Sequence, residues 1–115
     1  MKLIDTHCHI NLDDFKNDFE ELLSRIEDKL EFVINVGYDL KTSEESVNLS
    51  NKYGFIYATV GIHPHDSKTY NTLVKERLIE LVKNNNKVLA IGEIGLDYYR
   101  NYSPKEIQKK FLKSN

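Results

Sequence analysis

Short apolar runs alternate along the chain with longer segments whose apolar residues recur every three or four positions. The apolar runs predict buried strands, which lie at Met1–Asp5, Phe32–Val36, Phe55–Val60 and Lys87–Gly92. The longer segments predict amphipathic helices, at residues 15–30, 43–52 and 73–82. A polar turn at Asn11–Asp14 separates the first strand from the first helix.

A fourth helix is predicted after the last strand. Ser103, Pro104 and Glu106 lie at the spacing of a capping box, with a serine cap, a proline at the first helical position and a glutamate three residues after the cap. Ile107 and Phe111, four residues apart, supply the apolar face of this helix.

The alternation of strands and helices predicts an α/β fold with a parallel sheet built from four βα units. Two architectures use such units, a doubly wound open sheet and a (βα)8 barrel. Four units complete a small open sheet but make only half of a barrel, which would leave two strand edges unpaired. The order of elements alone therefore slightly favours the open sheet.

Composition narrows the class of protein further. The 115 residues are 40% hydrophobic and 30% charged, as expected for one globular domain. The net charge is −2, so no overall basic charge indicates a nucleic-acid partner. No apolar stretch approaches the roughly 18 residues of a membrane span, and no signal peptide is evident. The single cysteine, Cys8, is typical of a reducing compartment, so we expect a cytoplasmic protein.

The 4 histidines fall into two pairs, each of which follows a predicted strand. His7 and His9 extend the first strand, where alternate side chains share a face, and two imidazoles there form half of a site for zinc or manganese. Ordinary surface histidines are the alternative. Asp5, on the same face, is placed to orient one imidazole. Cys8 points the other way, and we expect it to pack in the interior.

Glu93 follows the fourth predicted strand in the run from Ala90 to Asp97. A carboxylate at an apolar strand end is costly to bury unless it is paired or bound to metal. Gly92 and Gly95 allow a close approach of backbone or ligand. A carboxylate can bridge two metal ions, so Glu93 is the natural centre of a two-metal site, although a solvent-exposed glutamate is the alternative. Asp97 either supports this site or caps the following loop.

The second histidine pair is predicted to lie in a loop, because Pro64 interrupts strand hydrogen bonding between His63 and His65. Such a pair is better suited to holding an oxyanion or phosphate than to binding metal, and His63 is the stronger candidate because it is nearer the strand. Arg100 is a candidate phosphate contact. Tyr98, Tyr99 and Tyr102 beside it are suited either to stacking on a base or to ordinary loop packing.

Three motifs together resemble the TatD family of metal-dependent deoxyribonucleases, in the amidohydrolase superfamily: residues 5–9 (DTHCH), 60–65 (VGIHPH) and 90–98 (AIGEIGLDY). The resemblance covers essentially the whole chain and implies a (βα)8 barrel rather than an open sheet. It implies that His7 and His9 bind one divalent metal, that Glu93 bridges it to a second, and that His63 lines a phosphate pocket. Magnesium, manganese or zinc would serve phosphodiester hydrolysis of DNA.

The chain also departs from the family pattern. Family members are about twice as long, in line with barrels of about 250 residues, and their second half carries two more metal-binding histidines and an aspartate. No histidine follows His65 here. We therefore expect residues 1–115 to form a single partial domain, the amino-terminal half of the barrel, with impaired or no activity and a tendency to self-associate. A non-catalytic half-barrel that binds metal, and a related ester or amide hydrolase, are the alternatives.

Overall fold

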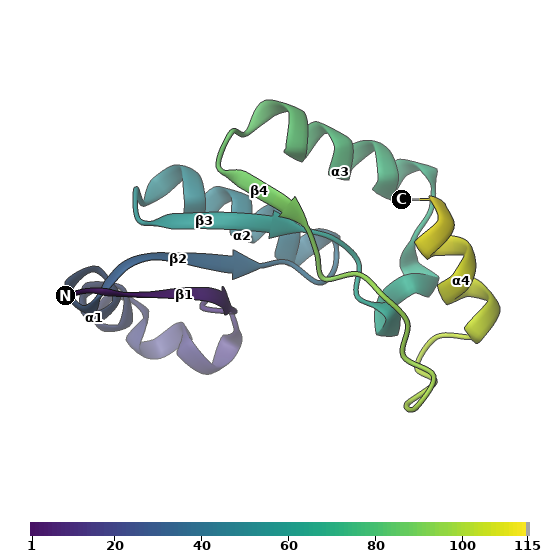
Figure 1. The fold of residues 1–115 in the computed structure, drawn as a ribbon, viewed down its shortest axis with the longest axis horizontal. Helices are drawn as coiled ribbons and strands as arrows, with labels where there is room; N and C mark the ends of the chain where they lie inside the picture. Colours follow the sequence, from purple (N-terminus) through teal and green to yellow (C-terminus); the bar gives the residue numbers. More distant parts are fainter. Residues whose placement is uncertain (115) are drawn as a thin grey trace.

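The computed structural model describes residues 1–114, and it contains a single parallel sheet in that range. The strands lie side by side in their order along the chain (Figure 1): β1 (Leu3–Cys8), β2 (Leu30–Val36), β3 (Ile56–Val60) and β4 (Val88–Ile91). A doubly wound sheet reverses its strand order at a switch point. This sheet has no such reversal within the described residues, so the open sheet favoured by element order alone is wrong.

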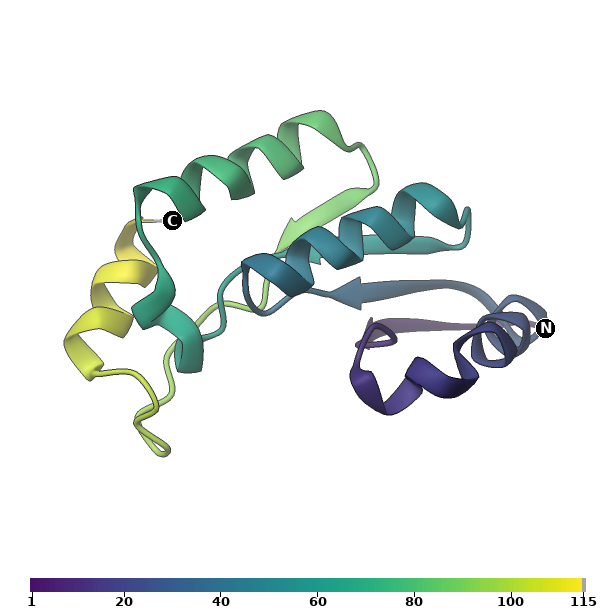
Figure 2. The same ribbon diagram turned by 180° about the vertical axis from the view of Figure 1, so that it is seen from behind.

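Three helices connect the strands and pack against the sheet: α1 (Phe19–Lys29), α2 (Leu40–Lys52) and α3 (Thr72–Asn84). A fourth helix, α4 (Lys105–Ser114), follows β4 and packs against η2 (Pro64–Thr69), one of two short 3₁₀ segments; the other is η1 (Asp13–Asp18). Figure 2 shows α2 in front of the sheet with α3 beside it. None of the described helices is both long enough and apolar enough to cross a membrane.

The core lies between the sheet and its helices, in two clusters. One gathers Ile10, Leu23, Ile26, Val33 and Ile56 around α1. The other gathers Val47, Ala58, Val60, Ile62, Leu78, Leu81 and Phe111 under α2, α3 and α4. Along β3, buried residues alternate with partly buried ones, which is the period-two pattern of a strand with one covered face. The helices therefore fix one face of the sheet, and the ends of its strands carry the candidate site.

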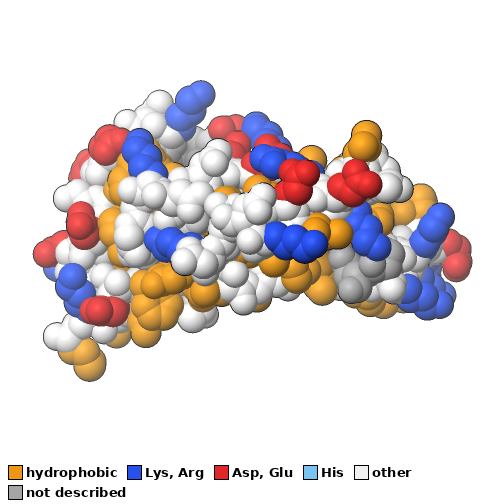
Figure 3. All heavy atoms as spheres, turned by 90° about the horizontal axis from the view of Figure 1, so that it is seen from above, with side chains coloured by type: hydrophobic (Ala, Val, Ile, Leu, Met, Phe, Trp, Pro, Cys, Tyr) orange, Lys and Arg blue, Asp and Glu red, His pale blue; other side chains and the backbone are white. Residues whose placement is uncertain are grey.

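The outer strands of the sheet expose apolar side chains. Leu3 and Ile4 of β1 and Leu89 and Ile91 of β4 are all exposed. On the side of α3, by contrast, Figure 3 shows acidic and basic side chains interspersed over the surface. The exposed apolar side chains therefore lie on both outer strands of the sheet.

Two predicted helix boundaries differ from the structure. The helix predicted from Phe15 begins as α1 at Phe19, because the preceding aspartates and asparagine favour turns and form η1 instead. Helix α2 begins at Leu40, three residues before the predicted start. The Asp39 carboxylate accepts the Thr42 N–H at 2.7 Å, and the Thr42 hydroxyl accepts the Asp39 N–H at 3.0 Å. This capping box uses threonine where glutamate is usual.

Helix α4 begins at Lys105, one residue after Pro104, the predicted first helical position. The Ser103 hydroxyl, which was expected to cap this helix, has other partners among the described residues. It donates to the His65 carbonyl oxygen at 2.7 Å and accepts the Lys68 N–H at 3.3 Å. Ser103 therefore joins the start of α4 to η2, the segment that follows His63.

Candidate metal centre

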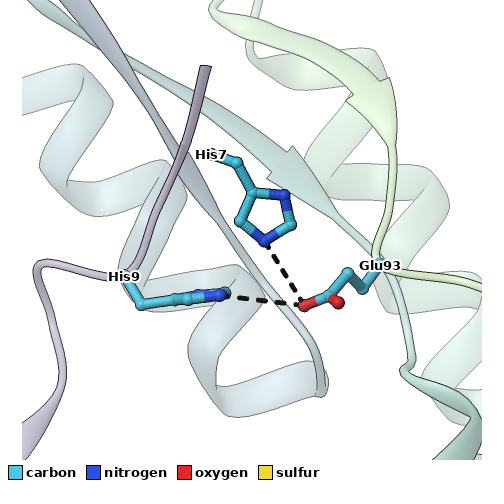
Figure 4. A group of neighbouring side chains, drawn as sticks. All are labelled: His7, His9 and Glu93. Atoms are coloured by element: carbon cyan, nitrogen blue, oxygen red, sulfur yellow. Dashed lines mark ion pairs between the residues drawn. The ribbon is translucent and has the colours of Figure 1, made fainter. Parts of the chain in front are cut away.

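His7, His9 and Glu93 meet at the carboxyl ends of β1 and β4 (Figure 4). His7 lies within β1, His9 follows it directly, and Glu93 is two residues beyond β4. The Glu93 Oε2 atom lies 3.8 Å from Nε2 of His7 and 3.8 Å from Nε2 of His9. The structure thus brings together residues that sequence spacing alone placed only at the same edge of the sheet.

Backbone hydrogen bonds carry Glu93 across the end of the sheet. Gly92 N–H donates to the Val60 carbonyl of β3 at 2.9 Å, and Glu93 N–H donates to the Gly37 carbonyl beyond β2 at 2.8 Å. The Thr59 hydroxyl donates to the Gly92 carbonyl at 3.1 Å. The chain leaving β4 therefore passes over β3 toward β2, and this crossing brings the Glu93 carboxylate within reach of the β1 histidines.

Gly61 is the residue over which this crossing passes. A Cβ atom at position 61 would lie 2.7 Å from the Gly92 carbonyl carbon and 2.9 Å from the Glu93 carbonyl oxygen. Both atoms are backbone, so no side-chain rotation relieves the clash. Glycine at position 61 therefore permits the path that positions Glu93. This role was not predicted, because it depends on a contact with Gly92 and Glu93, which are distant in the sequence.

The His9 ring is held in one tautomer. Its Nδ1 lies 2.8 Å from the Val36 carbonyl oxygen. A carbonyl only accepts hydrogen bonds, so Nδ1 carries the proton, and the neutral ring keeps a lone pair on Nε2. That lone pair is on the side of Glu93. Carbonyl-anchored imidazoles of this kind are typical of metal-binding histidines.

The turn that carries His9 is fixed by a buried asparagine. Asn35 of β2 accepts the Ile10 N–H at 2.7 Å through Oδ1 and donates to Asn11 Oδ1 at 3.0 Å and Ser46 Oγ at 2.7 Å. Its side chain is fully buried. This role was not predicted, although a polar residue inside the apolar run of β2 is a sequence signal for it.

His63 has the opposite tautomer. Its Nδ1 accepts the His65 backbone N–H at 3.1 Å, so the proton of the neutral ring is on Nε2. Nε2 lies 3.8 Å from Glu93 Oε1. Burial, followed by the neighbouring His65, lowers the pKa of His63 and favours this neutral form. His63 therefore presents an N–H donor to the site, whereas His9 presents a lone pair.

Asp97 pairs with His65, and this contact was not predicted. Its Oδ2 atom is hydrogen-bonded to His65 Nε2, while Oδ1 accepts the backbone N–H groups of Tyr99 at 3.0 Å and Arg100 at 3.1 Å. The bond to His65, with smaller help from the Arg100 N–H, lowers the pKa of Asp97. Asp97 thus caps the loop through Oδ1 and holds the His65 ring through Oδ2.

The remaining candidate residues lie around this centre. Asp5 Oδ1 accepts the backbone N–H of His7 at 3.0 Å, so Asp5 orients the strand end rather than an imidazole ring. Arg100 is exposed in the turn that follows Asp97. Cys8 packs against the α1 cluster, and its thiol donates to the Ile34 carbonyl at 3.4 Å. Burial, helped by Asp5, raises the pKa of the Cys8 thiol to about 12, which fits the predicted packing role.

The Glu93 carboxylate is partly buried and accepts no hydrogen bond from any described residue, although it faces His7, His9 and His63. A separation of 3.8 Å is too long for a hydrogen bond. It suits two atoms bound to one ion, since ligands about 2.1 Å from a shared metal lie at most about 4.2 Å apart. The ligand atoms of all three residues lie within 4.8 Å of one another, a bound slightly above that limit, and both distances to Glu93 are below it. Two imidazole nitrogens and a carboxylate oxygen are a donor set that fits a divalent transition metal.

Comparisons with a family model and with known proteins point to the same family. The family model for TatD related DNase matches residues 4–115. The uncharacterized metal-dependent hydrolase YabD of Bacillus subtilis is 38% identical, over 97% of this chain and 44% of YabD. The 3'-5' ssDNA/RNA exonuclease TatD of Shigella flexneri is 31% identical, over 96% of this chain and 43% of that protein.

Solved structures show the same relationship. A TatD family hydrolase from Entamoeba histolytica superposes with a TM-score of 0.85 at 28% identity, over 99% of this chain and 44% of that one. The TatD homologue YJJV from Escherichia coli gives 0.83 at 29% identity, over 96% and 44%. The chain spans less than half the length of these relatives, and its βα units correspond to the amino-terminal half of their barrel. The chain belongs to the TatD family of metal-dependent hydrolases.

Proposed function

We propose that this chain carries the amino-terminal half of the active site of a metal-dependent phosphodiesterase that acts on DNA. The observation that supports the proposal most is the Glu93 carboxylate, which lies 3.8 Å from Nε2 of both His7 and His9 and accepts no hydrogen bond from the described residues. A partly buried carboxylate that accepts no hydrogen bond is strongly stabilised by a bound cation.

Three residues of the chain are proposed as metal ligands, and two further groups orient them. His7 Nε2, His9 Nε2 and Glu93 Oε2 would hold one divalent ion, and Glu93 Oε1 would remain for a second. Bound magnesium, manganese or zinc would activate water and polarise the phosphoryl oxygen. The Val36 carbonyl keeps the His9 lone pair on Nε2, and Asp5 fixes the backbone at His7.

Two residues are proposed to bind the substrate phosphate. His63 faces the centre with a protonated Nε2 and donates a hydrogen bond to an anionic oxygen. Arg100 is exposed on the turn held by Asp97 and offers a bidentate donor to phosphate. Asp97 acts only indirectly, by shaping this turn and holding His65. A relative named as an exonuclease on single-stranded DNA and RNA agrees with a substrate of this class.

The described half of the site is proposed to be insufficient for efficient turnover. It offers three donors for one ion and, for a second, only the remaining Glu93 oxygen. We propose that residues 1–115 form one partial barrel domain, which self-associates through the exposed apolar residues of β1 and β4. Isolated chains then bind metal and nucleic acid more readily than they cleave it.

Fluorescence anisotropy with a labelled single-stranded DNA 10-mer tests the proposed function. Binding should require Mn²⁺, and Glu93→Gln or His63→Ala should weaken it at least about tenfold. Arg100→Ala should weaken it as well, whereas Arg25→Ala, which removes an exposed arginine from α1, should leave it unchanged. Binding that persists in excess chelator and in Glu93→Gln would contradict the proposal.

A further inference from the structure

Gln108 of α4 has a fully buried carboxamide that lies outside the metal centre. Its Oε1 accepts the Asp97 N–H at 2.7 Å. Its Nε2 donates to the carbonyl oxygens of Asp97 at 3.0 Å and Ser103 at 2.8 Å. One side chain thus closes the segment 97–103 by bonding to both of its ends. Burying an amide is worthwhile only when its polar atoms are paired in this way.

Both residues held by Gln108 in turn hold His65. The Asp97 carboxylate is hydrogen-bonded to the His65 ring. The Ser103 hydroxyl donates to the His65 carbonyl oxygen at 2.7 Å. The ring and the backbone of His65 are therefore both fixed by groups whose own positions depend on Gln108.

His65 passes this constraint to His63. The His65 backbone N–H donates to His63 Nδ1 at 3.1 Å, which places the His63 proton on Nε2, 3.8 Å from Glu93 Oε1. The two rings also touch edge to face, with their centroids 4.1 Å apart. A continuous set of contacts therefore runs from the buried amide of α4 to the N–H that faces the metal centre.

We propose that Gln108 is a positioning residue that fixes the orientation and tautomer of His63 through Asp97, Ser103 and His65. The proposal rests on the proposed function in one respect, that the His63 N–H meets the substrate. Glutamine suits the task because it supplies an acceptor for one N–H and donors for two carbonyls. Glutamate has nearly the same shape, but its second oxygen would face those two carbonyls without a proton.

The test is the ring ¹⁵N spectrum of the histidines in the intact chain, which reports tautomers without any need for activity. In the wild type, His63 should be protonated at Nε2 alone, and His9 at Nδ1 alone. In Gln108→Glu, the ratio of the Nε2-protonated to the Nδ1-protonated tautomer of His63 should fall at least about fivefold, while the His9 tautomer stays unchanged. The control is Phe111→Leu, which loosens the packing of α4 in the core but leaves the Gln108 hydrogen bonds in place, and should keep the wild-type His63 signals.

Asp97→Asn provides an independent variant, since it removes the carboxylate partner of His65 and leaves the Gln108 amide bonded to the backbone. It should shift the His63 and His65 signals in the same direction as Gln108→Glu. Wild-type signals for His63 in either folded variant would overturn the proposal. If the tautomers change but binding of the DNA 10-mer with Mn²⁺ does not, the positioning role stands and the phosphate contact of His63 fails.

Discussion

A Cβ atom on Gly61 would lie only 2.9 Å from the Glu93 carbonyl oxygen. The end of β3 and the segment after β4 are in contact only because residue 61 has no side chain. This contact lets the Glu93 N–H reach the Gly37 carbonyl and brings the carboxylate to the β1 histidines. The placement of the proposed metal ligand thus depends on a glycine that touches no metal.

Gly61→Ala should displace the Gly92–Glu93 backbone and separate Glu93 from His7 and His9. We expect the affinity for Mn²⁺ or Zn²⁺ to fall at least about tenfold and the free energy of unfolding to fall by about 1–3 kcal/mol, as for other overpacked sites. Calorimetric titration and urea unfolding measure the two effects. Gly54→Ala is the matched control, because nothing lies within 4 Å of its Cβ position. Unchanged metal affinity in Gly61→Ala would contradict this account of Glu93.

Asn35→Leu should damage both stability and the site. The substitution leaves the Ile10 N–H and the partners on Asn11 and Ser46 unpaired in the interior, so the free energy of unfolding should fall by at least about 2 kcal/mol. Metal affinity should fall too, because the turn at His9 loses its anchor. Asn51→Leu removes an exposed amide and should change stability by no more than about 0.5 kcal/mol. Equal stability of the two variants would count against the role assigned to Asn35.

Lys87→Met should destabilise the fold without changing the metal centre. The Lys87 ammonium donates to the carbonyl oxygens at the end of α2, at 2.6 Å to Ser50 and 2.8 Å to Tyr53, and burial lowers the pKa of Lys87. Loss of these charge-assisted bonds should reduce the free energy of unfolding by about 1.5–3 kcal/mol. The control is Lys83→Met, on an exposed position of α3. Thermal unfolding of the two variants at the same midpoint would refute the prediction.

Cys8 should resist alkylation in the folded chain. Burial raises the pKa of its thiol from 9.0 to about 12, and only the thiolate reacts. At pH 9, iodoacetamide should modify the folded chain at least about a hundredfold more slowly than the urea-unfolded chain. The folded pKa exceeds the unfolded one, so Cys8 should also lower the free energy of unfolding as pH rises from about 9 to about 12. A folded-state rate close to the unfolded rate would show that Cys8 is accessible.

Local periodicity predicted the parallel strands, and the rule that parallel strands end at one edge placed His7, His9 and Glu93 at the same edge of the sheet. That the three residues share one metal site was implied only by the family resemblance. The predicted start of α1 at Phe15 was wrong, because the apolar pattern that begins there competes with turn-forming aspartates and an asparagine. The start of α2 was missed as well, because threonine replaces glutamate in the Asp39 capping box.

What the sequence could not supply are contacts between distant segments. The pairing of Asp97 with His65 joins residues 32 positions apart, and the Gly61 crossing depends on how far the chain bends after β4. The opposite tautomers of His9 and His63 are set by the Val36 carbonyl and by a backbone N–H. Both partners are backbone groups, and every residue type except proline carries both, so the sequence does not indicate them. The chemical difference between the two histidines therefore appears only in the three-dimensional structure.

Calorimetric titration of the wild-type chain and Glu93→Gln with Mn²⁺ and with Zn²⁺ tests the central claim most directly. We predict a metal site in the wild type that is weakened at least about tenfold in Glu93→Gln and lost in the double variant His7→Ala with His9→Ala. Glu106→Gln, which alters an exposed glutamate of α4, should bind as the wild type does. Equal binding by the wild type, Glu93→Gln and the double variant would contradict the assignment of His7, His9 and Glu93 as the metal ligands.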